Sequence, residues 1–325
     1  MYLYSFLAFV LSAVSTGFAL RFLIPLLHRR LLDKPNERSS HSTPTPSGGG
    51  VSFVIIAFLF SLIYFLFFPS LSSSNFLLYY APILLLPLSI VGFLDDIFGL
   101  PSLFRYGIQV ITALLLLLVS PLLGSNSTPL LSFFCLIAVT ALINFTNFTD
   151  GMDGLVAGCM TFSISAAAFK LGAPLTIWVL IGSLLGFLVW NWSPARVFMG
   201  DVGSTFLGAL FSALVLSSPS WTDALSILLL ATPLFADALL CVFRRLFAGH
   251  NIFQAHRLHL FQRLHQSGWS HARVSFHYIS ATVLLSIASL LGGLLLVIAL
   301  VFVVLSIGLW LDQKVAVPFA NPQFD

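Results

Sequence analysis

Charged side chains are scarce in this chain of 325 residues. Asp, Glu, Lys and Arg make up 8% of it, whereas soluble domains carry about 25%. Hydrophobic residues make up 58%, and the mean hydropathy is +1.03. The sequence also lacks the alternating segments of about ten residues that a transmembrane β-barrel requires. This composition excludes an ordinary soluble domain and predicts an all-α protein, a polytopic bundle of transmembrane helices.

Cysteine is scarce as well. Cys135, Cys159 and Cys241 lie in or beside apolar runs and have no metal-ligand spacing. We therefore expect them to pack as small core residues and not to form disulfides. Linkers, low-complexity tracts and internal repeats are missing, so we expect a single domain over residues 1–325. The missing repeats weigh against many transporter architectures.

Apolar runs of about 20 residues recur along the chain, and each is long enough to cross a bilayer of roughly 30 Å as a helix. The first run is too long for a signal peptide and is expected to be a retained helix. Only Gly292 and Gly293 divide the last two runs, so ten or eleven spans both fit. The expected spans are residues 3–27, 50–69, 78–94, 104–122, 128–144, 155–171, 174–191, 204–219, 224–243, 275–291 and 293–311.

The basic residues indicate the orientation of these spans, because Lys and Arg concentrate in cytoplasmic loops. With eleven spans, 12 of the 14 basic residues lie on one side, Lys170 lies on the other, and Arg21 lies inside the first span. We therefore expect the N-terminus outside and the C-terminus in the cytoplasm. The net charge of +3 reflects this sidedness and indicates no nucleic-acid partner. The cytoplasmic set is Arg29, Arg30, Lys34, Arg38, Arg105, Arg196, Arg244, Arg245, Arg257, Arg263, Arg273 and Lys314.

The sequence N-F-T-N-F-T-D-G-M-D-G covers residues 144–154 and places a polar side chain at every third position. Carboxylates at i and i+3 would share one side of a helical turn, and glycines let the backbone approach a ligand closely. Two amides followed by two carboxylates indicate one wall of a site for a phosphate-bearing ligand, with or without a metal. A polar connector between two helices is the alternative. The polar residues are Asn144, Asn147, Asp150 and Asp153.

Carboxylates also stand at two other expected helix ends. Asp95 and Asp96 are adjacent at the inner end of the third span, and both stay ionised only beside a cation or a donor. One of them is a candidate general base or holds an acceptor. Asp201 precedes the eighth span, and a carboxylate beside phosphate oxygens is a usual way to share Mg²⁺. The alternative is a solvated helix end for Asp95 and Asp96, and a helix cap for Asp201.

The loop over residues 33–50 contains three prolines and three glycines, so we expect an ordered loop without a helix. Arg38 and His41 in this loop can donate to phosphate oxygens. A cationic membrane anchor is the alternative.

The longest cytoplasmic loop carries His256 and His259 at i and i+3, beside Arg257 and Arg263. Zinc binding by the two histidines has no supporting motif, and contacts to a diphosphate fit better. An amphipathic helix on the membrane surface is the alternative.

A further carboxylate, Asp237, falls inside the ninth span, where an ionised group is costly. We expect it to pair with Arg244 or Arg245 and give it no catalytic role.

In chain order these motifs are D-x-P-x-x-R-x-x-H, D-D, N-x-x-N-x-x-D-G-x-D-G, M-G-D-x-G-S and a last loop with histidines. Over nearly its whole length the chain resembles the polyprenyl-phosphate N-acetylhexosamine-1-phosphate transferases, glycosyltransferase family 4. The resemblance implies a multi-pass enzyme of the bacterial cytoplasmic membrane with its active site on the cytoplasmic face. Its substrates would be a UDP-sugar and polyprenyl phosphate, its cofactor Mg²⁺ or Mn²⁺, and its assembly a monomer or a homodimer.

The resemblance also implies roles for individual residues. The aspartate pair handles the lipid phosphate, and the cofactor ligands are Asp201 and Asn147. The implied catalytic residues are Asp95, Asp96, Asp201 and His259. The substrate-binding candidates are Arg38, His41, Asn144, Asn147, Asp150, Asp153, Asn191, His256, Arg257 and Arg263.

The last loop lacks the run of adjacent histidines found in the phospho-N-acetylmuramoyl-pentapeptide transferase branch. The chain therefore looks like the branch that starts surface polysaccharides such as O-antigen, and that other branch is the alternative. A polyprenyl-linked sugar transporter or flippase, or an inactive membrane scaffold, would come from a different class, and neither would release UMP.

Overall fold

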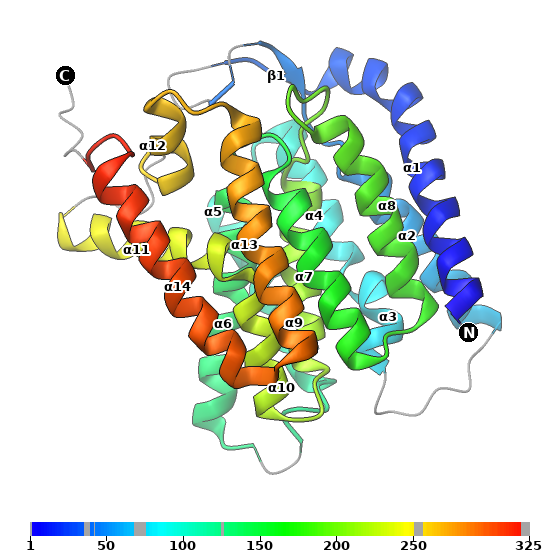
Figure 1. Ribbon diagram of the computed structural model, residues 1–325. Helices are drawn as coiled ribbons and strands as arrows, with labels where there is room; N and C mark the ends of the chain where they lie inside the picture. The colour runs from blue at the N-terminus through cyan, green and yellow to red at the C-terminus, as the bar shows by residue number, and fades with distance from the viewer. Residues whose placement is uncertain are drawn as a thin grey trace.

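A computed structural model of the chain describes residues 2–35, 40–41, 43–67, 76–124, 127–249 and 256–319. The described part is almost entirely helical, which confirms the predicted all-α class (Figure 1). The elements are α1 (Tyr2–Arg30), β1 (Leu32–Asp33), β2 (Thr45–Pro46), α2 (Val51–Phe67), α3 (Phe76–Leu84), α4 (Leu86–Phe98), α5 (Ser102–Leu118), α6 (Pro129–Thr149), α7 (Leu155–Leu171), α8 (Leu175–Asn191), α9 (Asp201–Leu216), α10 (Trp221–Leu228), the 3₁₀ helix η2 (Leu229–Ala231), α11 (Thr232–Phe247), α12 (Leu260–Gln266), α13 (His271–Leu291) and α14 (Gly293–Lys314).

Six helical segments are long and apolar enough to cross a membrane, and five shorter apolar helices accompany them. These segments coincide with the expected spans, and two of them are interrupted: α3 continues into α4, and α10 continues through η2 into α11. Residues 68 and 69, the end of the second expected span, lie outside the described residues. The chain is therefore a multi-pass membrane protein.

The last two apolar runs are two separate helices. Gly293 has φ +68°, a left-handed conformation that glycine adopts without strain and that lets the chain reverse. Helix α14 then runs back at an angle to α13, so that α1 begins at the lower end of the bundle and α14 ends at the upper end (Figure 1).

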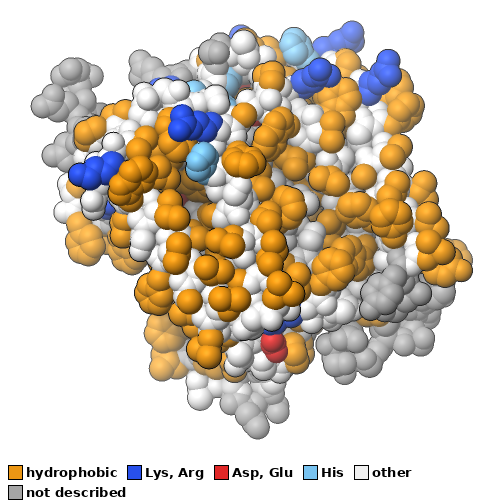
Figure 2. All heavy atoms as spheres, in the orientation of Figure 1, with side chains coloured by type: hydrophobic (Ala, Val, Ile, Leu, Met, Phe, Trp, Pro, Cys, Tyr) orange, Lys and Arg blue, Asp and Glu red, His pale blue; other side chains and the backbone are white. Residues whose placement is uncertain are grey.

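Helices differ in burial according to their place in the bundle. Helix α9 is buried along nearly its whole length, as expected for a helix that is apolar on all sides. In α14 only Val297 and Val301 are buried. Figure 2 shows hydrophobic side chains over the middle of the visible face, while most of the visible Lys and Arg lie toward its upper end and a small basic patch lies beside the acidic one near the lower end. This distribution suits a surface that faces lipid in the middle and water at the end.

Glycines let helices cross closely at the upper end. A Cβ atom on Gly92 of α4 would lie 2.7 Å from the backbone carbonyl of Asp201 at the start of α9. Gly200 has φ +75°, and a Cβ there would lie 2.5 Å from Asp96 Oδ2. A larger residue at either position would push the Asp96 and Asp201 carboxylates apart.

The loop after α1 is ordered by a short strand pair, with Leu32 opposite Pro46. The Phe198 amide donates to the Pro46 carbonyl at 2.8 Å, and the Gly49 amide donates to the Phe198 carbonyl at 2.9 Å. The described residues of this loop form no helix, as predicted. The loop thereby becomes one wall of the cavity described next.

Candidate active site

A cavity of about 550 Å³ opens at the end of the bundle where α1, α4, α6 and α8 end and where α9 and α13 begin. Its size falls within the ordinary range for small-molecule sites. Residues from all five sequence motifs line it. From the sequence candidates the lining includes His41, Asp96, Asn147, Asp150, Asp153, Asn191 and Asp201.

The stretch 144–154 takes two conformations. Helix α6 continues to Thr149, and Asp150 stands at its C-cap with φ −78° and ψ 48°. Asp150 and Asp153 therefore lie in the connecting turn, and the expectation that they share one side of a helical turn was wrong. Asn144 donates to Gln109 Oε1 of α5 at 2.6 Å and is not among the residues that line the cavity.

Asp96 and Asp201 meet at the N-terminus of α9. The backbone amides of Asp201 and Val202 donate to the two carboxylate oxygens of Asp96 at 3.0 and 3.3 Å. A helix N-terminus has free amides that suit a carboxylate. Asn147 Nδ2 donates to Asp201 Oδ1 at 2.8 Å and to Ser204 Oγ at 3.0 Å, which leaves its side-chain oxygen as the atom that can bind a cation.

The two adjacent aspartates have different environments. Asp95 Oδ1 accepts from the Leu100 amide at 2.6 Å, and Asp95 Oδ2 accepts from Arg105 Nη1 at 2.5 Å. The same Arg105 nitrogen lies 3.1 Å from Asp201 Oδ2. Asp96 faces the cavity, whereas Asp95 is not among its lining residues. The structure thus gives different environments to Asp95 and Asp96, which the sequence alone could not distinguish.

A chain of contacts runs from Asp153 through His271 to the loop after α1. His271 Nδ1 lies 3.1 Å from Asp153 Oδ1, and its Nε2 lies 2.9 Å from the Ser40 carbonyl. Burial opposes the charge of Asp153, but the hydrogen bond and charge of His271 and the Ala195 amide outweigh it and lower the pKa of Asp153. Asp153 therefore stays ionised at neutral pH.

Asn191 and His41 also line the cavity. The Asn191 side chain accepts from the Gly154 amide at 3.1 Å and donates to the Val197 carbonyl at 2.9 Å, so it joins two loops. The His41 ring packs edge-on against Phe198 at 4.8 Å. Arg38 lies outside the described residues.

The histidines and arginines of the last loop lie elsewhere. His256, Arg257, His259 and Arg263 are not among the residues that line the cavity, although Gln262 of the same segment is. Buried Arg263 donates to the carbonyls of Leu258 and Val317 and pairs with Asp312. Their contacts to a diphosphate stay predictions.

Asp237 does not pair with Arg244, one of its two expected partners. Its carboxylate accepts from the amides of Leu260 and Phe261 and from the Tyr278 hydroxyl, and it lies 3.6 Å from His259 Nδ1. Arg244 pairs with Asp312 instead, at 2.9 and 2.6 Å. The expected Asp237–Arg244 pair was therefore wrong, because Asp237 binds the start of α12 and Arg244 binds Asp312. The alternative pair with Arg245 stays a prediction.

Comparison with known proteins identifies the family. A model of glycosyl transferase family 4 matches residues 78–218. The decaprenyl-phosphate N-acetylglucosaminephosphotransferase of Mycobacterium leprae is 31% identical over 314 residues, which cover 81% of this chain and 77% of the relative. The chain belongs to glycosyl transferase family 4. This confirms the resemblance found in the sequence and makes the protein a membrane transferase.

Other relatives carry a different name. The phospho-N-acetylmuramoyl-pentapeptide-transferase of Enterococcus faecalis is 30% identical over 274 residues, 76% of this chain and 84% of the relative. The Streptococcus agalactiae protein of that name is 35% identical over 205 residues, 55% of this chain and 61% of the relative. Similarity by itself thus does not choose between the two branches.

The donor set of the transferase's cavity fits Mg²⁺. Asp96, Asp150 and Asp201 supply carboxylate oxygens and Asn147 an amide oxygen, and Mg²⁺ prefers oxygen ligands. Burial, together with the negative charges of Asp201 and Asp96, raises the pKa of Asp150 to about 8. Such a shift reports an excess of negative charge, which a divalent cation would relieve.

Sequence reasoning missed three lining or bridging residues of the transferase: Arg105, Gln262 and His271. Arg105 was used only for orientation, and His271 was one of several histidines in a long loop. A lone basic residue close after an acidic pair was the available signal for Arg105. Gln262 and His271 carried no such signal, because only the packing of α12 and α13 brings them to the cavity.

Proposed function

We propose that this transferase moves an N-acetylhexosamine-1-phosphate, or its 6-deoxy form, from a UDP-sugar to polyprenyl phosphate and releases UMP. The convergence of Asp96, Asn147, Asp150 and Asp201 at one cavity carries this proposal. A diphosphate and a divalent cation need such a cluster of oxygen ligands with a nearby cation, here Arg105. The product would start a lipid-linked surface glycan.

The reaction would be a direct displacement at phosphorus. An oxygen of the lipid phosphate forms a bond to the β-phosphorus of the UDP-sugar, and the bond from that phosphorus to the bridging oxygen breaks. The electron pair leaves with UMP. The bond between C1 of the sugar and its oxygen stays intact, so the anomeric configuration is retained.

Each wall would hold one part of the substrates. Asp201 and Asn147 would be the Mg²⁺ ligands, and Mg²⁺ would offset the charge of the diphosphate and of the leaving UMP. Asp96 would position the lipid phosphate at the C-terminal, cytoplasmic end of α4. A phosphate monoester is already mostly ionised at neutral pH, with a second pKa of about 6, so positioning matters more than proton removal.

We also propose eleven spans, with the N-terminus outside and the cavity in the cytoplasm of a bacterial inner membrane. The positions of the helix ends support an odd number of crossings. The bilayer then delivers polyprenyl phosphate at a fixed depth, which lowers the entropy cost of bringing two substrates together.

A panel of UDP-sugars tests the proposal. Membranes containing the full chain are supplied with polyprenyl phosphate and one UDP-sugar at a time, and UMP and the lipid-linked product are measured. We expect both products with a UDP-N-acetylhexosamine. Release with UDP-N-acetylmuramoyl-pentapeptide alone would instead assign the second branch, which the Enterococcus and Streptococcus relatives favour. Sugar uptake without UMP would contradict a transferase.

A further inference from the structure

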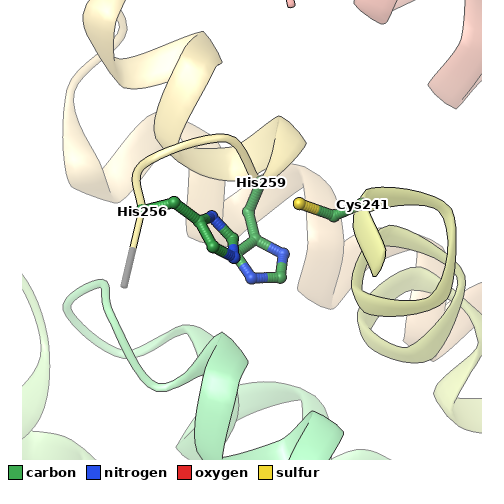
Figure 3. A group of neighbouring side chains, drawn as sticks. All are labelled: Cys241, His256 and His259. Atoms are coloured by element: carbon green, nitrogen blue, oxygen red, sulfur yellow. The ribbon is translucent and has the colours of Figure 1, made fainter. Parts of the chain in front are cut away.

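Three side chains of metal-binding type converge outside the lining of the acidic cavity, on a part of the chain that the proposed reaction leaves unexplained. Cys241 comes from α11, and His256 and His259 come from the segment that leads into α12 (Figure 3). One ligand atom from each residue lies within 4.8 Å of the others. Sequence spacing does not group them, because fourteen residues separate Cys241 from His256.

The cluster contains a buried nitrogen that lacks a hydrogen bond. The His259 side chain is 4% exposed, and its Nδ1 forms no hydrogen bond with the described residues. Its nearest carboxylate oxygen, Asp237 Oδ1, is 3.6 Å away. A buried nitrogen that forms no hydrogen bond is costly, and an ion between Nδ1 and Cys241 would supply a closer contact than the ion pair with Asp237.

The surroundings hold two of the three ligands in place. Asp237 accepts the amides of Leu260 and Phe261, which fixes the start of α12 directly after His259. Asp237 and Cys241 are one turn apart on α11, so both face the same segment.

We propose that Cys241, His256 and His259 form a binding site for Zn²⁺ or a cation of similar chemistry. One thiolate and two imidazoles suit zinc, with a fourth position left for water, whereas the oxygen ligands of the cavity suit Mg²⁺. Binding releases the thiol proton and any proton on the coordinating His259 nitrogen. It also replaces the 3.2 Å hydrogen bond from the Leu258 amide to His256 Nδ1 if that nitrogen binds the ion.

The bound ion would regulate the transferase, and this part rests on the proposed function. It would clamp the start of α12 against α11. Gln262 of α12 lines the cavity, so the clamp also fixes one wall of the substrate site. Zinc is therefore an inhibitor whose action requires Cys241.

Direct metal binding tests the site without any activity assay. The full chain in detergent is titrated with Co²⁺, whose thiolate charge-transfer and tetrahedral d–d absorption report a sulfur ligand, and Zn²⁺ is then added as competitor. We expect one equivalent of Co²⁺ with a thiolate band, and an affinity at least about tenfold weaker in Cys241→Ser and in half-buried His256→Gln. Cys159→Ser, a buried cysteine of α7, is the matched control and should keep the band. A wild-type spectrum without the band, or a band that persists in Cys241→Ser, overturns the site.

Zinc inhibition of UMP release tests the regulatory part. The Zn²⁺ concentration that halves the rate at saturating Mg²⁺ should rise at least about tenfold in Cys241→Ser. Equal inhibition of both proteins overturns regulation through this site. If no UDP-sugar yields UMP, the proposed function fails while the cobalt titration still decides the site.

Discussion

The carboxylate of Asp96 on α4 accepts the backbone amide of Asp201, the first residue of α9, at 3.0 Å. The two aspartates are 105 positions apart in the chain. Their contact joins the motif assigned to the lipid phosphate with the motif assigned to the cation. This contact uses only the backbone amide of Asp201. The Asp201 carboxylate accepts from Arg105 and Asn147 and can also bind a cation.

Asp201→Asn is expected to lower UMP release at least about 100-fold at every Mg²⁺ concentration, because a neutral amide cannot replace a charged ligand. Asp223→Asn is the matched control, since Asp223 pairs with Lys170 and does not line the cavity. Near-normal turnover of Asp201→Asn would remove this residue from the cation site.

Gly92→Ala is expected to destabilise the protein and to reduce turnover. Its Cβ would lie 2.7 Å from the Asp201 backbone, and overpacking of this kind costs typically 1–3 kcal/mol. Gly107→Ala on α5 is the control, because nothing lies within 4 Å of a Cβ there. The unfolding temperature in detergent measures the difference, and equal values for both variants would refute the close crossing of α4 and α9.

Arg105→Gln is expected to tighten Mg²⁺ binding and to slow turnover. The guanidinium contacts both Asp95 and Asp201, so its removal makes the site more negative while a donor to phosphate is lost. Mg²⁺ titrations of thermal stability and of UMP release separate the two effects. Arg273→Gln, whose guanidinium stacks on Trp269, should change neither. Weaker Mg²⁺ binding in Arg105→Gln would contradict this role.

Asp153→Asn is expected to lower the unfolding temperature at pH 7. The pKa of Asp153 is lowered in the fold from about 3.9 in the unfolded chain. Its contribution to stability is therefore complete above about pH 4 and is lost as the pH falls through the lower folded value. The gap between variant and wild type should close in acid, and a gap independent of pH would exclude an ionised Asp153.

Asp150→Asn is the control for that experiment, because its effect on the unfolding temperature should have the opposite sign. Because burial and nearby charge raise the pKa of Asp150 to about 8, its ionisation opposes folding. The variant should therefore unfold at the same or a higher temperature than wild type at pH 7.

A reporter fused after the C-terminal residue is expected to read as cytoplasmic. Eleven crossings that start from an outside N-terminus end in the cytoplasm, the side on which most basic residues lie. A fusion in the loop between α9 and α10, at the opposite end of the bundle, should read as external. A C-terminal reporter that reads as external would mean an even number of crossings.

Composition and motifs were enough to predict the helical class, the positions of the apolar helices and the family. Low charge and apolar runs of bilayer length leave few alternatives, since backbone polar groups in lipid must be satisfied within helices. The motif residues that line the cavity were also found this way, because a carboxylate at a membrane helix end is too costly to be incidental.

How these residues meet could be seen only once the helices were packed together. The tertiary structure placed Asp96 in the cavity and tied Asp95 to Arg105, brought His271 to Asp153, and joined Cys241 to two histidines of a different segment. Side-chain contacts between distant segments depend on how helices cross and where loops fold back, and glycines such as Gly92 set those distances. Spacing along a chain records which groups are available, whereas packing determines which of them share a neighbour.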